Sequence, residues 1–182
     1  TFSLTLPTAN YPQPQARGQM YQRILDQLRG LPGVQGASAM SGLPPNRPLD
    51  ANDTDIDNYT APVEGPFENI DYYQQVMTHY FETMGIPVVE GRPITDEDKE
   101  GGTKAVVING TMAKKFWPKG DALGKRFRFF GDKEPWAVIV GIAKDSAQYY
   151  FDHTITMDLL SSQGDDGAED TMPGDSVRPA GA

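Results

Sequence analysis

The sequence predicts an α+β domain built on a mixed β-sheet, with βαβ units and a C-terminal β-hairpin. Three observations lead to this prediction. Short segments with alternating or continuous apolar residues recur along residues 1–151, as is typical of strands. Residues 16–31 instead carry apolar side chains at the 3.6-residue spacing of an amphipathic helix. Two apolar runs flank the dipeptide Gly131-Asp132, which is a strong signal for a hairpin turn.

The first elements are predicted to form a strand–helix–strand unit. Residues 1–7 (TFSLTLP) alternate apolar and polar side chains, which indicates a half-buried strand. The helix over residues 16–31 follows and ends before Pro32 and Gly33. Residues 34–40 (VQGASAM) then read as a second short strand. Because a helical crossover joins parallel strands, we expect these two strands to share a sheet.

A long polar loop is predicted over residues 41–68, because this stretch is rich in proline, aspartate and asparagine. Loops of this length in a compact domain are usually functional or poorly ordered. A strand over residues 68–78 follows, and then a short helix with Thr78 as its N-cap and Gly85 after its last turn. Residues 86–91 (IPVVEG) complete this region as a brief strand.

The stretch from residue 104 onward has the most regular pattern. Residues 104–109 (KAVVIN) form a continuous apolar run, which predicts a strand buried on both faces. A helix over residues 110–117 should follow, with Asn109 as its N-cap. A strand–turn–helix of this kind can hold a phosphate, but neither GxxxxGK[ST] nor GxGxxG is present. Residues 125–131 and 135–143 are the two strands of the predicted hairpin.

The character of the chain changes at residue 152. Residues 152–182 are rich in glycine, aspartate, serine and proline, and hold seven of the 25 acidic residues but only one of the 16 basic ones. Such a composition buries too little apolar surface to offset the entropy of ordering. We therefore expect a domain over residues 1–151 and a disordered acidic tail over residues 152–182.

Composition excludes several classes of function. The chain of 182 residues has no cysteine, which excludes disulfides and thiolate chemistry, and its net charge of −9 argues against binding to nucleic acid. No apolar run approaches the roughly 20 residues that a membrane-spanning helix needs. No signal-peptide pattern opens the chain, which starts at Thr1 and is expected to be part of a longer protein.

One acidic segment has the spacing of a calcium loop. Positions one, three, five and twelve of an EF-hand-like pattern are held by Asp53, Asp55, Asp57 and Glu64. Position six is Asn58, where an EF-hand needs glycine, and no helix is predicted to enter the loop. Both a cation site and an ordinary solvated acidic loop remain open at this stage.

Other candidate groups do not assemble into a reactive centre. The carboxylate run at residues 96–100 lies on a predicted surface turn, and His79 and His153 are far apart in the sequence. A basic cluster could meet lipid headgroups or an acidic partner, or be an ordinary mixed surface; it comprises Lys114, Lys115, Lys119, Lys125, Arg126 and Arg128. We therefore assign no catalytic, cofactor-binding or metal-binding residue.

Four aromatic residues, Tyr72, Tyr73, Tyr80 and Phe81, form a stripe in the predicted strand and helix of residues 68–85. Such a stripe can bind an apolar ligand, but aromatic side chains more often pack between a helix and a sheet. We expect these residues to belong to the core.

Three segments taken together resemble a known family. They are Tyr80–Asp98, Ala105–Phe129 and Trp136–Asp145, and Leu28–Pro45 also fits. In this order they resemble the MacB-like periplasmic core domain of ABC transporter permeases, the MacB/FtsX group, and especially the acidobacterial-type permeases. The matching positions are Tyr80-Phe81, Met84-Gly85-Ile86, Gly91-Arg92, Val107-Ile108-Asn109, Ala113-Lys114, Trp117-Pro118 and Leu123-Gly124-Lys125.

The resemblance implies a non-catalytic domain without cofactors. In this family the domain lies on the periplasmic side of the inner membrane, between two transmembrane helices of the same permease. A separate ATPase subunit or domain hydrolyses ATP, the permease is commonly a homodimer, and the domain passes conformational change toward efflux. The family pattern continues beyond Asp145, so the domain is expected to be incomplete here. The alternative is a stand-alone periplasmic module that binds a ligand or a metal.

Overall fold

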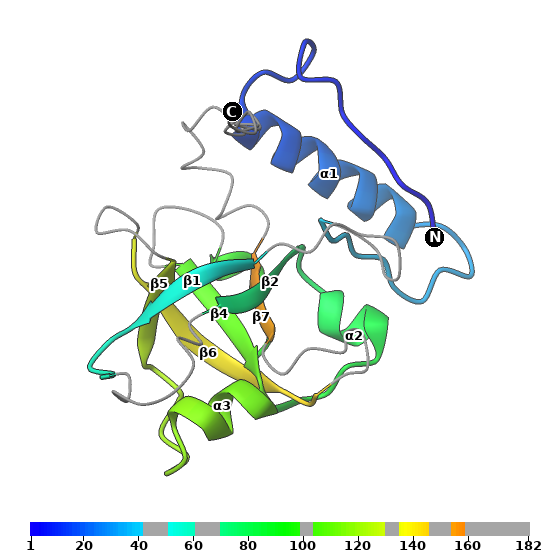
Figure 1. Ribbon diagram of the computed structural model, residues 1–182. Coiled ribbons are helices and arrows are strands. Elements are labelled where there is room, and N and C mark those ends of the chain that lie inside the picture. Colours follow the sequence, from blue (N-terminus) through cyan, green and yellow to red (C-terminus); the bar gives the residue numbers. More distant parts are fainter. Residues whose placement is uncertain (42–50, 61–69, 99–103, 130–134, 146–153, 159–182) are drawn as a thin grey trace, which may run out of the picture.

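The computed structural model describes six stretches of the chain: residues 1–41, 51–60, 70–98, 104–129, 135–145 and 154–158. Within them, the helices are α1 (Pro14–Arg29), α2 (Tyr80–Met84), the 3-10 turn η1 (Asp96–Asp98) and α3 (Gly110–Phe116). The strands are β1 (Ala51–Ile56), β2 (Ile70–Val76), β3 (Val88–Gly91), β4 (Lys104–Asn109), β5 (Arg126–Phe129), β6 (Ala137–Ala143) and β7 (Thr154–Asp158). All seven strands belong to one mixed sheet (Figure 1).

The sheet closes on itself. Its strand order is β3-β6-β4-β7-β2-β1-β5, and β5 pairs with β6 as well. The first residues of β6, Ala137 and Val138, pair with β5, whereas Gly141 to Ala143 pair with β3. Strand β4 runs parallel to β6 along its other edge. One edge of β6 is therefore shared by two strands, and every strand except β3 lies in a closed ring.

The change of partner along β6 depends on two glycines. A Cβ atom on Gly91 would lie 2.3 Å from the carbonyl oxygen of Val140, and one on Gly141 would lie 2.2 Å from that of Arg92. The N–H group of Arg92 donates to the same Val140 oxygen at 3.0 Å. Gly91 also has φ of 70°, in the region that side chains disfavour. Only residues without a side chain allow the two backbones to approach this closely.

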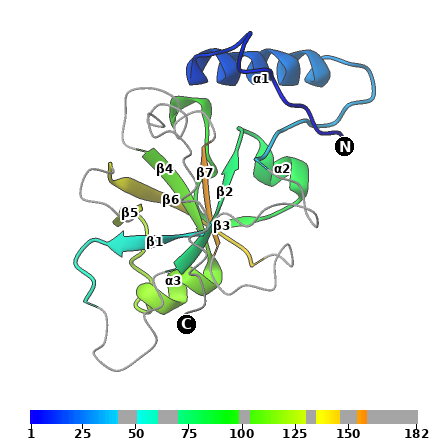
Figure 2. The ribbon, with the colours of Figure 1, turned by 45° about the horizontal axis from the view of Figure 1, so that its top comes forward.

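Strand β4 lies at the centre of the core, as its apolar sequence predicts. Its residues Ala105 to Ile108 are all buried. Val106 and Ile108 pack with α3 on one face, and Val107 packs with α2 on the other. Figure 2 shows α1 and α3 at opposite ends of the sheet. The fold class predicted from the sequence is confirmed, and the mixed sheet is covered by a helix on each face of β4.

Most helix boundaries follow the expected signals. The Asn109 side chain accepts the Met112 N–H at 2.9 Å, which confirms it as the N-cap of α3. Gly85 ends α2 in the left-handed conformation, as predicted. The predicted N-cap Thr78 is wrong, because His79 holds that position with φ of 66° and Thr78 is buried one residue earlier.

The predicted N-terminal βαβ unit is not formed. Helix α1 is present, shifted by two residues to start at Pro14, but residues 1–7 and 34–40 are not strands. Only Met40 makes an isolated antiparallel bridge, to Val76 of β2. The physical reason is that a strand needs a paired neighbour, and these two segments do not pair with each other.

Two strands arise where the sequence predicts none. Strand β1 lies within the predicted loop of residues 41–68, and β7 lies within the tail predicted to be disordered from residue 152. β7 pairs with β2 in parallel and with β4 in antiparallel orientation, so it completes the ring between them. Residues 159–182 and the expected turn at Gly131-Asp132 lie outside the described residues.

The hairpin prediction is confirmed where it can be compared. Arg126 of β5 lies opposite Val138 of β6, and Phe127 lies opposite Ala137, in antiparallel register. The stripe of aromatic residues is core where it is described: Tyr80 and Phe81 are buried and pack edge to face with ring centroids 5.3 Å apart.

We predict that Gly91→Ala lowers the free energy of unfolding by more than about 3 kcal/mol, through left-handed strain and a backbone clash. The matched control is Gly120→Ala, since Gly120 has φ of 77° but open space around it. Its cost should be about 1–2 kcal/mol from strain alone. Urea denaturation measures both variants. Equal losses would contradict the role given to the close approach of β3 and β6.

Candidate functional site

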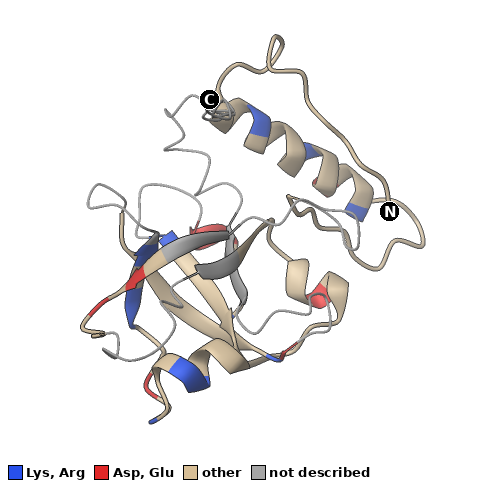
Figure 3. Ribbon diagram, in the orientation of Figure 1, with Lys and Arg blue, Asp and Glu red and all other residues tan. Residues whose placement is uncertain are grey.

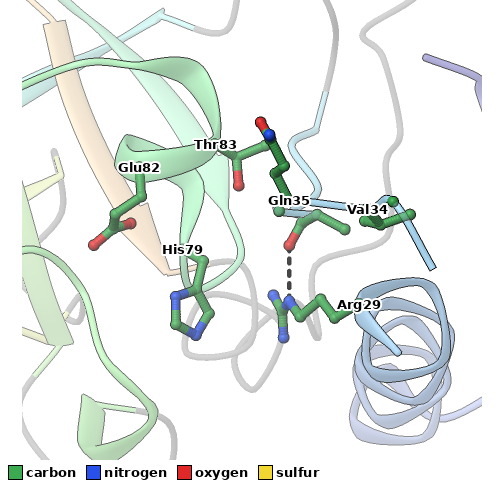
Figure 4. Close-up of a pocket in the computed structure, with 9 residues that line it drawn as sticks. Arg29, Val34, Gln35, His79, Glu82 and Thr83 are labelled. Carbon is green, nitrogen blue, oxygen red and sulfur yellow. Dashed lines mark hydrogen bonds between the residues drawn. The ribbon is translucent and has the colours of Figure 1, made fainter. Parts of the chain in front are cut away.

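A surface hollow of about 630 Å³ lies between the C-terminal end of α1, the segment after it, and α2 (Figure 4). Its volume is within the range of small-ligand sites. The residues that line it are Arg29, Gly33, Val34, Gln35, Gly36, Ala37, His79, Glu82 and Thr83. The hollow therefore marks the junction where the α1 layer meets the rest of the domain.

Arg29 holds this junction together. Its Nε donates to the carbonyl oxygen of Ala37 at 2.9 Å, and its Nη2 donates to that of Thr78 at 3.2 Å. Its Nη1 also pairs with Asp26 on the preceding turn of α1 at 3.1 Å. A guanidinium can make these contacts together because its donors form a rigid, planar fork. One side chain thus links α1 to the segment after it and to the turn between β2 and α2.

A small apolar cluster and a hydroxyl support the same junction. Leu25 of α1 packs on Met77, and both side chains are buried. The hydroxyl of Ser38 donates to the carbonyl oxygens of Met77 and Thr78, at 3.1 and 3.0 Å. Gly36 faces Thr83 of α2, so that a Cβ atom there would lie 3.3 Å from the threonine hydroxyl. Apolar contact and backbone hydrogen bonding therefore act at one place.

The turn from β2 into α2 is strained and incompletely bonded. His79 is left-handed although it is not glycine, and its exposed side chain points toward the hollow (Figure 4). Left-handed backbone in such residues costs about 1–2 kcal/mol. Among the described residues, the buried hydroxyl of Thr78 has no hydrogen-bond partner. The conformation of this turn is therefore stabilised by hydrogen bonds to the carbonyl oxygens of Met77 and Thr78, and the side chains of Thr78 and His79 do not favour it.

The carboxylate run contains no acid–base pair in the described residues. Both oxygens of Asp98 bind the Arg92 guanidinium at 2.7 Å, and one accepts the Thr95 N–H at 2.8 Å. The hydrogen bonds from Arg92 hold the pKa of the Asp98 carboxyl below its ordinary value. A general acid needs the opposite shift. Asp98 therefore fastens the η1 turn to the end of β3.

The EF-hand-like spacing has a different explanation in the structure. Asp55 and Asp57 lie at the β1 side of the sheet and pair with Arg128 and Arg126 of β5, at 3.1 and 2.7 Å. Figure 3 shows these opposite charges on adjacent strands. The described residues hold no group of three or more potential metal-binding side chains. The other two candidate ligands cannot be placed, because the Asp53 side chain and Glu64 lie outside the described residues.

Several side chains of the basic cluster also pair with different neighbours in the fold. Arg126 and Arg128 both lie over the indole ring of Trp136, at 5.4 and 4.9 Å from its centroid, in addition to their aspartate partners. Lys125 pairs with Asp121 at 3.3 Å. These contacts favour the interpretation of an ordinary mixed surface over that of a lipid-binding patch.

The strand–helix junction that could hold a phosphate is occupied by the chain itself. The Asn109 side chain binds the Met112 N–H, and the Asp145 carboxylate binds the Thr111 N–H at 2.9 Å. The N-terminus of α3 is therefore capped twice, once by a carboxylate. A phosphate there would displace both groups and meet a negative charge.

Comparison with known proteins agrees with this architecture. The MacB-like periplasmic core domain family matches residues 3–175 of the chain. The chain belongs to this family. No curated protein sequence matches it. The family match runs past residue 152, so β7 lies inside it.

Solved structures share the fold of this MacB-like domain. The periplasmic region of MacB from Actinobacillus actinomycetemcomitans has 16% sequence identity and a TM-score of 0.55, and the match covers 78% of this chain. The extracellular domain of the ABC-type transporter YknZ from Gram-positive bacteria has 19% identity and a TM-score of 0.52 over 76% of this chain. The matched part spans 56% and 62% of those two chains. Among the described residues, no helix has the length and apolar character needed to cross a bilayer.

Sequence reasoning missed Arg29 and His79 as residues of the junction. Arg29 lies on the polar side of α1, where exposure is the usual expectation, and its carbonyl partners at Ala37 and Thr78 are not visible in a sequence. The sequence indicated the position of His79 only indirectly. Gly85 predicts the C-terminal end of the short helix α2, and His79 lies just before its first residue.

We predict that Arg29→Ala lowers the free energy of unfolding by about 2 kcal/mol, because two backbone carbonyls lose a charged donor. Arg29→Lys should lose most of the same stability, since a single ammonium cannot replace the fork. The matched control is Arg23→Ala, an exposed position on the same helix, with an expected change within about 0.5 kcal/mol. Equal stability of the Arg29→Ala and Arg23→Ala variants in urea denaturation would contradict this role.

Proposed function

We propose that the chain is the extracytoplasmic domain of an ABC-type efflux permease, and that it transmits conformational change without catalysing a reaction. The observation that carries this proposal is the family match over residues 3–175. The fold shared with the periplasmic region of MacB and the extracellular domain of YknZ supports it. The domain would lie on the periplasmic side of the inner membrane, as part of an integral membrane protein.

The partners follow from this placement. We propose that transmembrane helices of the same full-length permease hold the domain, that a separate ATPase subunit or domain drives it, and that two copies form a homodimer. No cofactor and no nucleic acid is part of the proposal. We keep the expected division into a domain over residues 1–151 and an acidic segment over residues 152–182 as part of the proposal, with the addition that β7, at the start of the acidic segment, belongs to the sheet.

The proposed mechanism is mechanical. A closed ring of strands resists bending, because moving one strand breaks hydrogen bonds on both of its edges. Helices α2 and α3 pack on opposite faces of β4 and oppose twisting of the ring at its centre. When the ATPase closes, the membrane helices would displace the ring as one body, and that displacement would open or close a periplasmic surface.

The alternative, a stand-alone ligand-binding or metal-binding module, has less support. Asp55 and Asp57 are paired with arginines, and the tyrosine and phenylalanine of the aromatic stripe at α2 are core. Among the described residues, the hollow beside Arg29 offers space for a small ligand, but three hydrogen bonds of the arginine are already made within the chain.

The location is tested with a single cysteine at Lys119→Cys in a permease that carries this domain. These 182 residues contain no cysteine, so a label reports one site once any cysteines elsewhere in the permease have been replaced. Lys119 is exposed in the turn after α3. We expect a membrane-impermeant maleimide to label it in intact spheroplasts. Labelling that requires lysis would place the domain in the cytoplasm and contradict the proposal.

The transmission role is tested by replacing the domain with a short flexible linker in the same permease. We expect the ATPase to continue to hydrolyse ATP while efflux stops, since the moving membrane helices no longer have a periplasmic body to displace. Unchanged efflux by this variant, with equal amounts of protein in the membrane, would contradict the role.

A further inference from the structure

The guanidinium of Arg29 keeps unused hydrogen-bond donors in the hollow between α1 and α2. Its Nε donates to Ala37, its Nη2 to Thr78, and its Nη1 to Asp26. Each Nη atom carries two N–H groups, so one on each has no acceptor among the described residues. The side chain lines the hollow and is 23% exposed. These two N–H groups are therefore available to a bound molecule.

His79 places a second donor in the same hollow. Its side chain is exposed and has no hydrogen-bond or ion-pair partner in the described part of the chain. Figure 4 shows its imidazole and the Arg29 guanidinium pointing toward one another across the hollow. An imidazole donates from at least one ring nitrogen in both of its charge states. The two side chains can therefore donate to one group placed between them.

The backbone of His79 is a separate observation that points to a ligand. Its φ of 66° is uncommon for a residue other than glycine, and glycine at this position would avoid the strain. Within the described residues, the imidazole makes no hydrogen bond, ion pair or ring contact that offsets the cost. Strained residues of this kind gather at ligand sites and switches. A ligand bound by the imidazole accounts for a histidine here.

The charges around the hollow favour an anion with a single charge. Among the described lining residues, Arg29 supplies a permanent positive charge and Glu82 a negative one, while Asp26 already pairs with the arginine. A doubly charged phosphate would be repelled by both carboxylates. A carboxylate carries one charge and matches the planar guanidinium. Val34 and Ala37 add apolar lining, and about 630 Å³ leaves room for an apolar body beside that group.

We propose that the hollow between α1 and α2 is a binding site for a small organic carboxylate with an apolar body. The carboxylate group accepts hydrogen bonds from Arg29 and His79, and the apolar body lies against Val34 and Ala37. The inference does not depend on the proposed transport role, because it rests on the residues of the hollow alone.

An NMR titration of the 182-residue chain with N-acetyl-leucine tests this proposal. The matched control ligand is N-acetyl-leucine amide, which lacks only the charged group. We expect saturable shifts of the Gly36, His79 and Thr83 amide signals, with the millimolar dissociation constant of a ligand this small. The amide and inorganic phosphate should each bind at least about 10-fold more weakly. Signals of β4 should not move, since this strand does not line the hollow.

The His79→Gly variant separates a binding role from a structural one. Glycine relieves the left-handed strain, so the midpoint of urea denaturation should rise. The affinity for N-acetyl-leucine should fall about 10-fold, because a donor to the carboxylate is lost. The matched control is Met84→Ala, an exposed position of α2 outside the described lining, which should keep the affinity.

Four results would overturn the proposal. The first is the absence of saturable shifts at the hollow while the β4 signals show a folded chain. The second is equal affinity for N-acetyl-leucine and its amide, which would remove the role of the carboxylate. The third is equal or tighter binding of phosphate, which would make the hollow a general anion site. The fourth is unchanged affinity in His79→Gly, which would leave the strained histidine without a part in binding.

Discussion

The close contact of two backbones at Gly91 and Gly141 is the constraint on which the rest of the fold depends. It lets β3 pair with the second half of β6 along the same edge whose first residues pair with β5. The pairing of β5 with both β6 and β1 closes the ring, and β4 and β7 lie inside the sheet with a paired neighbour on each edge. A side chain at either glycine would separate β3 from β6 and leave an unpaired edge on each of these two strands.

The ring also explains how the helices are attached to the domain. Helix α3 belongs to the core, with its N-terminus capped by Asn109 and by Asp145. Helix α1 lies outside the ring and is fastened mainly through Arg29 and the pair of Leu25 and Met77. A rigid body with one outer layer attached at a single junction suits a domain that transmits movement. The chemical groups that do stand out, such as Asp98 and the arginines of β5, all serve to fasten the backbone.

The sequence predicted the elements whose signals are local, and it missed those that depend on distant partners. The strand of residues 104–109 and the N-cap Asn109 could be predicted, because the apolar run and the capping residue are adjacent in the sequence. Strand β1 could not, because its aspartates make it look like a loop until they meet Arg126 and Arg128, about 70 positions later. The strand β7 and the Arg29 junction were missed for the same reason. The family was found from the order of several short motifs, each of which is weak when taken singly.

The central claim is that the ring, α1 and α3 move as one body, and the most direct test measures a distance inside the domain. Spin labels on Arg23→Cys in α1 and Lys114→Cys in α3 would use two exposed positions in a chain without cysteine. Pulsed electron-spin distances would be measured in a permease carrying this domain, without nucleotide and with ATP trapped in its ATPase. The account predicts the same distance distribution in both states, while labels on two different copies move relative to each other. A shift in the distance within one domain would contradict it.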